Sequence, residues 1–190
     1  MSRAAVFLDR DGTLVEERGY IDRLDLLELF PWTADALRLL SREGFLTVVV
    51  TNQAAIGRGL IDEAFLDTVH HTLDERLARG RARVDRYYHC PHHPEAALAA
   101  FRTVCRCRKP GPGMIEQACR DLDIDPARSV MVGDRWIDVA AGQAAGTRTV
   151  LVRTGHGGHE AEHPPEGLRA DAILNNLMEA VAWILRTSVR

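Results

Sequence analysis

Two aspartates two positions apart, Asp9 and Asp11, follow a short apolar segment and precede Gly12. The apolar segment, residues 4–8, is typical of a buried strand, so Asp9 stands at the carboxyl end of that strand. Ligands bind at this end of the strands in open α/β sheets. One carboxylate in such a place can attack a phosphoryl group while the other transfers the proton of the leaving oxygen. A cation and further positive charge must then come from other parts of the chain.

Polar residues also follow later apolar runs of the chain. Thr51 ends the run that begins at residue 45, Lys109 stands in a loop beyond the next run, and Asp134 follows Gly133. Any one of these residues could cap a buried strand with no catalytic role. Because parallel strands bring their carboxyl ends to one edge of a sheet, the joint presence of all of them favours a shared site.

Strand-like runs alternate with helical patterns along the whole chain. Further strands are predicted at 45–51, 84–89, 129–133, 148–152 and 171–174. Helical spacing of apolar residues, with capping residues, prolines or glycines at the ends, predicts a helix that starts near Pro31 and stops at Gly44. It also predicts helices at 62–79, 113–122, 136–145 and after Asn176. The alternation predicts an α/β fold, a Rossmann-like, doubly wound, mostly parallel sheet with helices on both faces. The segment 154–167, rich in glycine, histidine and proline, is expected to be a mobile loop.

The composition is that of an ordinary globular protein, with 46% hydrophobic and 27% charged residues. With a net charge of −3, the chain lacks the excess of basic residues that favours binding to nucleic acids. No apolar run reaches the roughly 20 residues of a membrane span, and the first residues do not resemble a signal peptide. We therefore expect a cytoplasmic monomer with no nucleic-acid partner and no membrane association.

Four cysteines lie in or near a weakly patterned loop, where disulfides are disfavoured without a secretory signal. Cys90 and His92 form one tight pair, and twelve residues later Cys105 and Cys107 form another. Such a donor set suits a closed tetrahedral Zn²⁺ site. Reduced buried thiols beside a surface histidine are the alternative, and His93 is the competing ligand. Cys119 has the spacing of a core residue.

These motifs together resemble those of the haloacid dehalogenase superfamily, whose phosphatases use an aspartate nucleophile. The resemblance extends from Asp9-Arg10-Asp11-Gly12-Thr13 through Thr51-Asn52-Gln53 and Lys109-Pro110 to Gly133-Asp134 and Asp138, nearly the whole chain. Within the superfamily, the segments 18–20, 90–94 and 105–114 resemble those of bacterial D-glycero-D-manno-heptose 1,7-bisphosphate 7-phosphatases. Histidinol phosphatases share much of the pattern. The resemblance implies one phosphatase domain over 1–190, with a zinc-bound loop at about 90–107 and no separate cap domain.

The resemblance implies hydrolysis of a phosphomonoester through an aspartyl-phosphate intermediate. Asp9 would be the nucleophile and Asp11 the acid and base, with Thr51 and Lys109 as donors to the phosphoryl group. Catalytic Mg²⁺ would be held by the Asp9 carboxylate, the Asp11 main-chain carbonyl and the Asp134 carboxylate. Asp138, one helical turn after Asp134, would orient this site without binding the metal.

A small phosphorylated sugar is the implied partner, namely a heptose 1,7-bisphosphate whose 7-phosphate is removed during nucleotide-activated heptose biosynthesis. The expected substrate-binding residues are Glu17, Arg18, Gly19, Tyr20, Asn52, Gln53, Ala54, Arg108 and Arg135. Ala54 departs from the serine often found there. Arg18 and Arg58 are expected either to hold a second phosphate or to face solvent.

Two alternatives remain at this point. Histidinol phosphate is the alternative substrate of an enzyme. A signalling receiver domain, which keeps the phosphoryl group on its aspartate, is the alternative of another class.

The structural Zn²⁺ site at Cys90, His92, Cys105 and Cys107 would hold Arg108 and Lys109 over the phosphate.

Overall fold

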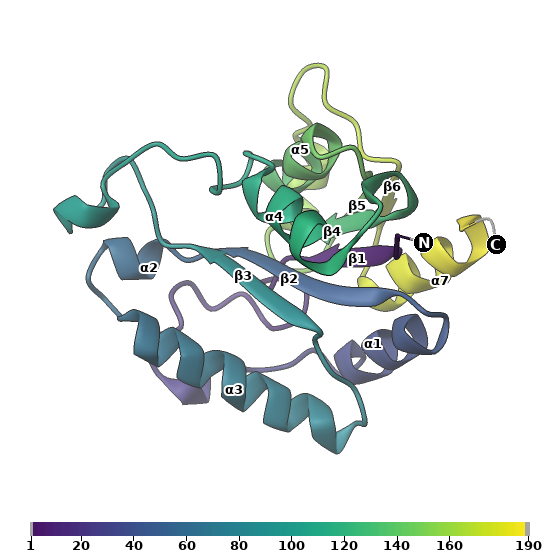
Figure 1. Ribbon diagram of the computed structural model, residues 1–190, viewed down its shortest axis with the longest axis horizontal. Coiled ribbons are helices and arrows are strands. Elements are labelled where there is room, and N and C mark those ends of the chain that lie inside the picture. Colours follow the sequence, from purple (N-terminus) through teal and green to yellow (C-terminus); the bar gives the residue numbers. More distant parts are fainter. Residues whose placement is uncertain (1, 189–190) are drawn as a thin grey trace.

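Short runs of apolar and β-branched residues form one parallel sheet in the computed structural model, which describes residues 2–188 (Figure 1). The strand order is β3-β2-β1-β4-β5-β6. The strands are β1 (Ala5–Leu8), β2 (Leu46–Asn52), β3 (Arg86–Cys90), β4 (Val130–Gly133), β5 (Arg148–Val152) and β6 (Ala172–Leu174). All residues of β1 and β4 are buried, as expected for central strands covered on both faces.

Helices cover both faces of the sheet, which confirms the predicted doubly wound α/β fold (Figure 1). One face carries α1 (Thr33–Arg42), α3 (Glu63–Arg79) and α7 (Leu177–Thr187), whose apolar residues share a core with β1 and β4. The other face carries α4 (Gly113–Leu122) and α5 (Trp136–Ala144), which pack on alternate side chains of the same strands. The hydrophobic core therefore lies in two layers, one on each side of the sheet.

The helix boundaries follow the capping residues of the sequence. The Asp62 side chain accepts from the Phe65 N–H at the start of α3, and the Asn176 side chain accepts from the Glu179 N–H at the start of α7. At the second cap, the Glu179 side chain in turn accepts from the Asn175 N–H at 3.0 Å. These caps satisfy N–H groups that have no partner within the helix.

The segment 154–167 is not the loop that we predicted. It contains α6 (Gly157–Glu162), which lies against α5 because the Trp136 indole donates to the Glu160 carbonyl oxygen at 2.7 Å. The segment has no apolar periodicity, so tertiary contacts such as this one specify the helix. A second short helix, α2 (Ala54–Gly57), follows the end of β2.

The order of the strands places the expected site at the carboxyl ends of β1 and β4. Strand order reverses at β1, with β2 on one side and β4 on the other, and this switch opens a crevice at the carboxyl ends. Within residues 2–188, the connection from β1 to β2 contains a loop with a 3₁₀ helix (Leu24–Leu26) and α1, and the connection from β2 to β3 contains α2 and α3. Neither connection forms a separate cap domain, as predicted. No helix in residues 2–188 has both the length and the hydropathy of a membrane span.

Candidate active site

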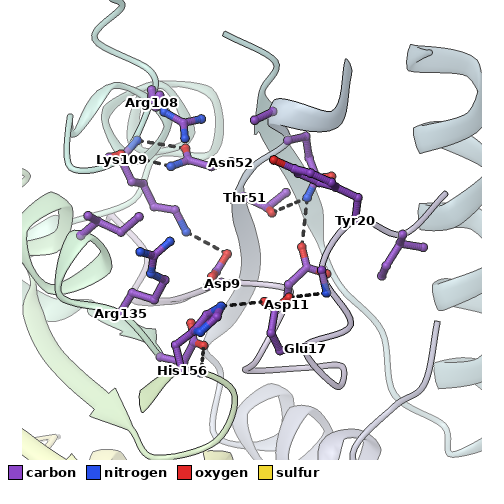
Figure 2. Close-up of a pocket in the computed structure, with 16 residues that line it drawn as sticks. Asp9, Asp11, Glu17, Tyr20, Thr51, Asn52, Arg108, Lys109, Arg135 and His156 are labelled. Carbon is purple, nitrogen blue, oxygen red and sulfur yellow. Dashed lines mark hydrogen bonds and ion pairs between the residues drawn. The ribbon is translucent and has the colours of Figure 1, made fainter. Parts of the chain in front are cut away.

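A cavity of about 270 Å³ opens at the carboxyl ends of β1, β2 and β4 (Figure 2). It contains most of the residues predicted from sequence. Its lining consists of Asp9, Asp11, Glu17, Gly19, Tyr20, Ile21, Thr51, Asn52, Gln53, Ala54, Arg108, Lys109, Asp134, Arg135, Ile137 and His156. The strand ends therefore bring together carboxylates and cations that are far apart in the chain.

Lys109 lies on the floor of the cavity, where Figure 2 shows its contact with Asp9, and a second carboxylate, that of Asp138, also contacts it. Its Nζ is 2.8 Å from Asp9 Oδ1 and 2.7 Å from Asp138 Oδ1, and it also donates to the Val50 carbonyl oxygen at 2.8 Å. Burial alone would lower the pKa of Lys109, but Asp138 and Asp9 raise it above its ordinary value. The ammonium therefore stays protonated and gives the floor a fixed positive charge.

The last residue of β2 fixes the loop that carries Lys109. Asn52 Nδ2 donates to the Lys109 carbonyl oxygen at 3.1 Å, and the Lys109 N–H donates to Asn52 Oδ1 at 3.0 Å. This pair of bonds couples the end of a central strand to the backbone of the loop. Asn52 was predicted to bind substrate. In this structure both polar atoms of its side chain are hydrogen-bonded to the Lys109 backbone.

Asp134 is a buried carboxylate with one free oxygen in the described part of the chain. Its Oδ2 accepts from the His156 N–H at 2.7 Å, whereas its Oδ1 has no hydrogen-bond partner. Burial, Asp9 and Asp138 raise the pKa of Asp134 to about 8. Oxygens of Asp9, Asp134 and Asp138 all lie within 4.8 Å of one another. Such a group of buried carboxylates fits a divalent cation with oxygen ligands.

Asp138 is already engaged by other groups. Its Oδ1 faces Lys109, and its Oδ2 accepts from the Arg135 N–H at 3.0 Å. Burial raises the pKa of Asp138 to about 6, against the opposing effect of the Lys109 charge. Both carboxylate oxygens of Asp138 therefore already have protein partners.

Asp11 is held by a residue that sequence reasoning missed. Arg10 is 1% exposed, and its Nε and Nη2 donate to the two carboxylate oxygens of Asp11 at 3.0 and 2.9 Å. Gln53 Nε2 also donates to Asp11 Oδ2 at 3.1 Å and to Thr51 Oγ1 at 2.8 Å. Two side chains, Arg10 after β1 and Gln53 after β2, thus hold the groups expected to transfer protons and bind the phosphoryl group.

The rim of the cavity carries both polar and cationic groups. Figure 2 shows Tyr20 and Glu17 across the cavity from Arg135. Glu17 accepts from the Gly19 N–H at 2.7 Å and lies 3.6 Å from His156 Nε2. Burial and, to a smaller extent, Asp11 raise the pKa of Glu17.

Two arginines considered for the substrate lie elsewhere. The Arg18 guanidinium is 2.7 Å from Glu28 and does not line the cavity, and the Arg58 guanidinium lies 5.8 Å from the centre of the Tyr20 ring. Arg108 and Arg135 are the arginines that do line it. His156 was not predicted, because its contact with Asp134 is made by the backbone and leaves no mark in the sequence.

Comparison with known proteins identifies the family. The HAD-hydrolase-like family model matches residues 106–180. The chain is 45% identical to the D-glycero-β-D-manno-heptose-1,7-bisphosphate 7-phosphatase of Escherichia coli K12, over 92% of this chain and 90% of that protein. The chain belongs to the heptose-bisphosphate phosphatase family. The Haemophilus ducreyi member is 41% identical over 97% of this chain and its own full length.

A solved structure of this phosphatase family is similar throughout. The heptose 1,7-bisphosphate phosphatase from B. bronchiseptica, complexed with magnesium and phosphate, has a TM-score of 0.84 and 31% identity. The alignment covers 96% of this chain and 98% of that one. The structure from Burkholderia thailandensis has a TM-score of 0.71 and 28% identity, over 96% of this chain and 99% of that one.

The heptose-bisphosphate phosphatase chain also brings its cysteine pairs together. The Sγ atoms of Cys90, Cys105 and Cys107 lie 3.0–3.4 Å apart, and His92 Nδ1 is 3.3 Å from Cys107 Sγ. His93 points elsewhere, since its Nδ1 accepts from the Glu95 N–H. Three sulfurs and one imidazole nitrogen, all within 4.8 Å, form a donor set that fits Zn²⁺.

This cluster connects directly to the cavity. The Arg108 N–H donates to Cys105 Sγ at 3.3 Å, and Arg108 Nη1 donates to the His92 carbonyl oxygen at 3.1 Å. The backbone and side chain of Arg108 are therefore both fixed by the cluster. Lys109 follows immediately and reaches the cavity floor.

Proposed function

We propose that this chain is a Mg²⁺-dependent phosphomonoesterase that removes the 7-phosphate of D-glycero-D-manno-heptose 1,7-bisphosphate in nucleotide-activated heptose biosynthesis. The observation that carries the proposal is the 2.8 Å contact between Lys109 and Asp9 on the floor of a cavity with arginines at its rim. A carboxylate and an ammonium so placed can receive a phosphoryl group. Family membership supports the substrate, and we propose that residues 1–190 act as one phosphatase domain.

Asp9 is the proposed nucleophile. The Arg10 N–H donates to Asp9 Oδ1 at 2.9 Å, and Lys109 also approaches Oδ1. These contacts fix the carboxylate, and we assign Oδ2 to the attack. An Asp9 Oδ2–phosphorus bond forms, the phosphorus–oxygen bond to the sugar breaks, and Asp11 gives its proton to the leaving oxygen. Water then attacks phosphorus while Asp11 takes up a proton, which frees phosphate and Asp9.

Positive charge assists both steps. The Lys109 ammonium and the Thr51 hydroxyl are placed to donate to the phosphoryl oxygens, where negative charge spreads in the transition state. The Asp9 carboxylate, the Asp11 main-chain carbonyl and the Asp134 carboxylate would hold Mg²⁺. When bound, the cation would offset the repulsion between the phosphate and these carboxylates. The unpartnered Oδ1 of Asp134 supports this assignment.

The rest of the substrate would lie in the open cavity. Arg108 and Arg135 are the candidates for its second phosphate, because guanidinium groups bind phosphate in a bidentate manner. Glu17 and Tyr20, on the other side of the cavity, would contact sugar hydroxyls. Structural Zn²⁺ at the cysteine cluster would keep Arg108 in this place.

Phosphate release from purified enzyme tests the proposal. We expect turnover of heptose 1,7-bisphosphate to exceed that of histidinol phosphate, with ³¹P NMR showing loss of the 7-phosphate. EDTA should abolish turnover and added Mg²⁺ should restore it. Asp9→Asn is the matched inactive control. Preference for histidinol phosphate would overturn the substrate, and retention of a stable phosphorylated protein without turnover would favour a receiver domain.

A further inference from the structure

Arg10 is a buried cation whose one ionic partner among residues 2–188 is Asp11. The pairing is bidentate, with Nε to Oδ1 at 3.0 Å and Nη2 to Oδ2 at 2.9 Å. A guanidinium fixes the plane of a carboxylate through such parallel bonds, which an ammonium cannot do. The orientation of Asp11 therefore depends on where Arg10 is held.

The charge of Arg10 acts on a stacked pair of rings, His70 and Tyr87. His70 and Tyr87 stack with ring centres 4.3 Å apart, and the Tyr87 hydroxyl donates to Asp74 at 2.6 Å. Burial, together with the charge of Arg10, lowers the pKa of His70 to about 3. Neither Arg10 Nη1 nor His70 Nε2 has a hydrogen-bond partner within residues 2–188, so the guanidinium is held through its two bonds to Asp11. The buried charge of Arg10 is balanced by Asp11, so moving either group would leave the other unpaired.

Asp11 presents its remaining exposed surface to the active-site cavity. Its side chain is 19% exposed and lines the cavity, whereas the Arg10 side chain is 2% exposed and does not. We propose that Arg10 is a positioning residue that fixes the Asp11 carboxylate for proton transfer to the leaving oxygen and from the attacking water. Arg10 does not touch the substrate. This inference rests on the proposed phosphatase function.

The chemistry of the leaving group separates this role from a purely structural one. A sugar alkoxide must be protonated as it leaves, whereas p-nitrophenolate is stable without a proton. Loss of a positioned acid therefore slows phosphoenzyme formation from alkyl phosphates much more than from p-nitrophenyl phosphate. General damage to the site would slow both substrates equally.

The test compares Arg10→Lys with wild type by kcat/KM, which reports the first irreversible step. We expect a loss on the order of 100-fold for heptose 1,7-bisphosphate and less than about fivefold for p-nitrophenyl phosphate. A burst of p-nitrophenolate should also appear, because Asp11 would activate water poorly in the second step. Arg76→Lys is the matched control, since Arg76 donates to the Leu24 and Leu27 carbonyl oxygens, outside the cavity. It should keep both rates.

A second pair of variants covers the case in which Arg10→Lys does not fold. Arg10→Gln combined with Asp11→Asn removes both charges of the pair and leaves no unpaired buried ion. Its rates on both esters should equal those of Asp11→Asn alone, because Arg10 acts through Asp11. A further loss in the double variant, or equal losses on both esters in Arg10→Lys, would overturn the inference alone. A wild-type chain inactive on both esters would overturn the proposed function as well.

Discussion

Lys109 Nζ lies 2.8 Å from Asp9 Oδ1, and the two side chains face each other on the floor of the cavity. Lys109 is also the single lysine of the chain, and the other 23 of its 24 lysine and arginine residues are arginines. A compact ammonium fits between Asp9, Asp138 and the Val50 carbonyl oxygen, whereas a planar guanidinium requires more room. The choice of lysine at this position is therefore chemical and does not reflect the general composition.

Lys109→Met should lower kcat by a factor on the order of 10²–10³, because it removes a fixed donor to the phosphoryl oxygens. Lys109→Arg should also be strongly impaired, although it keeps the charge. Steady-state kinetics on heptose 1,7-bisphosphate, with circular dichroism to check the fold, measures both effects. Wild-type kcat in Lys109→Arg would refute the geometric argument.

Two glycines leave room for Asp134. Gly12 and Gly155 have positive φ angles of 77° and 55°, and a Cβ added to either would lie 2.2 Å from Asp134 Oδ2. Gly155→Ala should displace this carboxylate and weaken both Mg²⁺ affinity and kcat. Gly146→Ala is the matched control, because its φ is 84° and nothing lies within 4 Å of the added Cβ. It should lose about 1 kcal/mol of stability and keep kcat. Equal kcat in both variants, measured across a Mg²⁺ titration, would contradict the prediction.

The cysteine cluster should support the loop that carries Arg108 and Lys109. Cys107→Ala should lose bound zinc and lower activity by about 10- to 100-fold, because the Arg108 backbone and side chain are both anchored there. Elemental analysis and limited proteolysis of the loop accompany the kinetics. Cys119→Ala, outside the cluster, should keep zinc and activity. Full turnover by zinc-free Cys107→Ala would rule out this role.

His70 should make stability depend on pH. Burial lowers the pKa of His70 from 6.5 to about 3, so below pH 6.5 the unfolded chain binds a proton that the folded chain does not. The contribution of neutral, buried His70 to the free energy of unfolding is therefore fully present above pH 6.5 and is lost as the solution is acidified. Between pH 7.5 and 5.5, wild type should lose about 1.4 kcal/mol more unfolding free energy than His70→Phe. Urea denaturation at both pH values measures the difference. Exposed His71, changed to Gln, should behave as wild type.

Much of the site could be predicted from local patterns. Apolar runs that end in polar residues located Asp9 and Asp134 at strand ends, and parallel pairing then brought them together. The spacing of the cysteine and histidine pairs indicated a four-donor cluster, which the structure contains. These features could be predicted because strand direction and the spacing of the pairs determine where the side chains meet.

Other features depend on tertiary contacts that carry no local signal. Arginine is a residue type usually found at the surface, yet the turn after β1 directs Arg10 inward, where it contacts Asp11. The helix α6 is specified by its contact with Trp136, and His156 reaches Asp134 through a backbone N–H. Arg18 turns away to Glu28, a pairing across ten residues that spacing alone does not predict. For α6 and His156 the partner lies in a distant segment of the chain.

Trapping the covalent intermediate tests the central claim, that Asp9 is the nucleophile. Enzyme mixed rapidly with heptose 1,7-bisphosphate is quenched in acid, reduced with borohydride and analysed by peptide mass spectrometry. An aspartyl phosphate is reduced to homoserine, and we predict this change at position 9 in wild type and its absence in Asp9→Asn. Turnover without any modification at position 9, or modification at another carboxylate, would contradict the account.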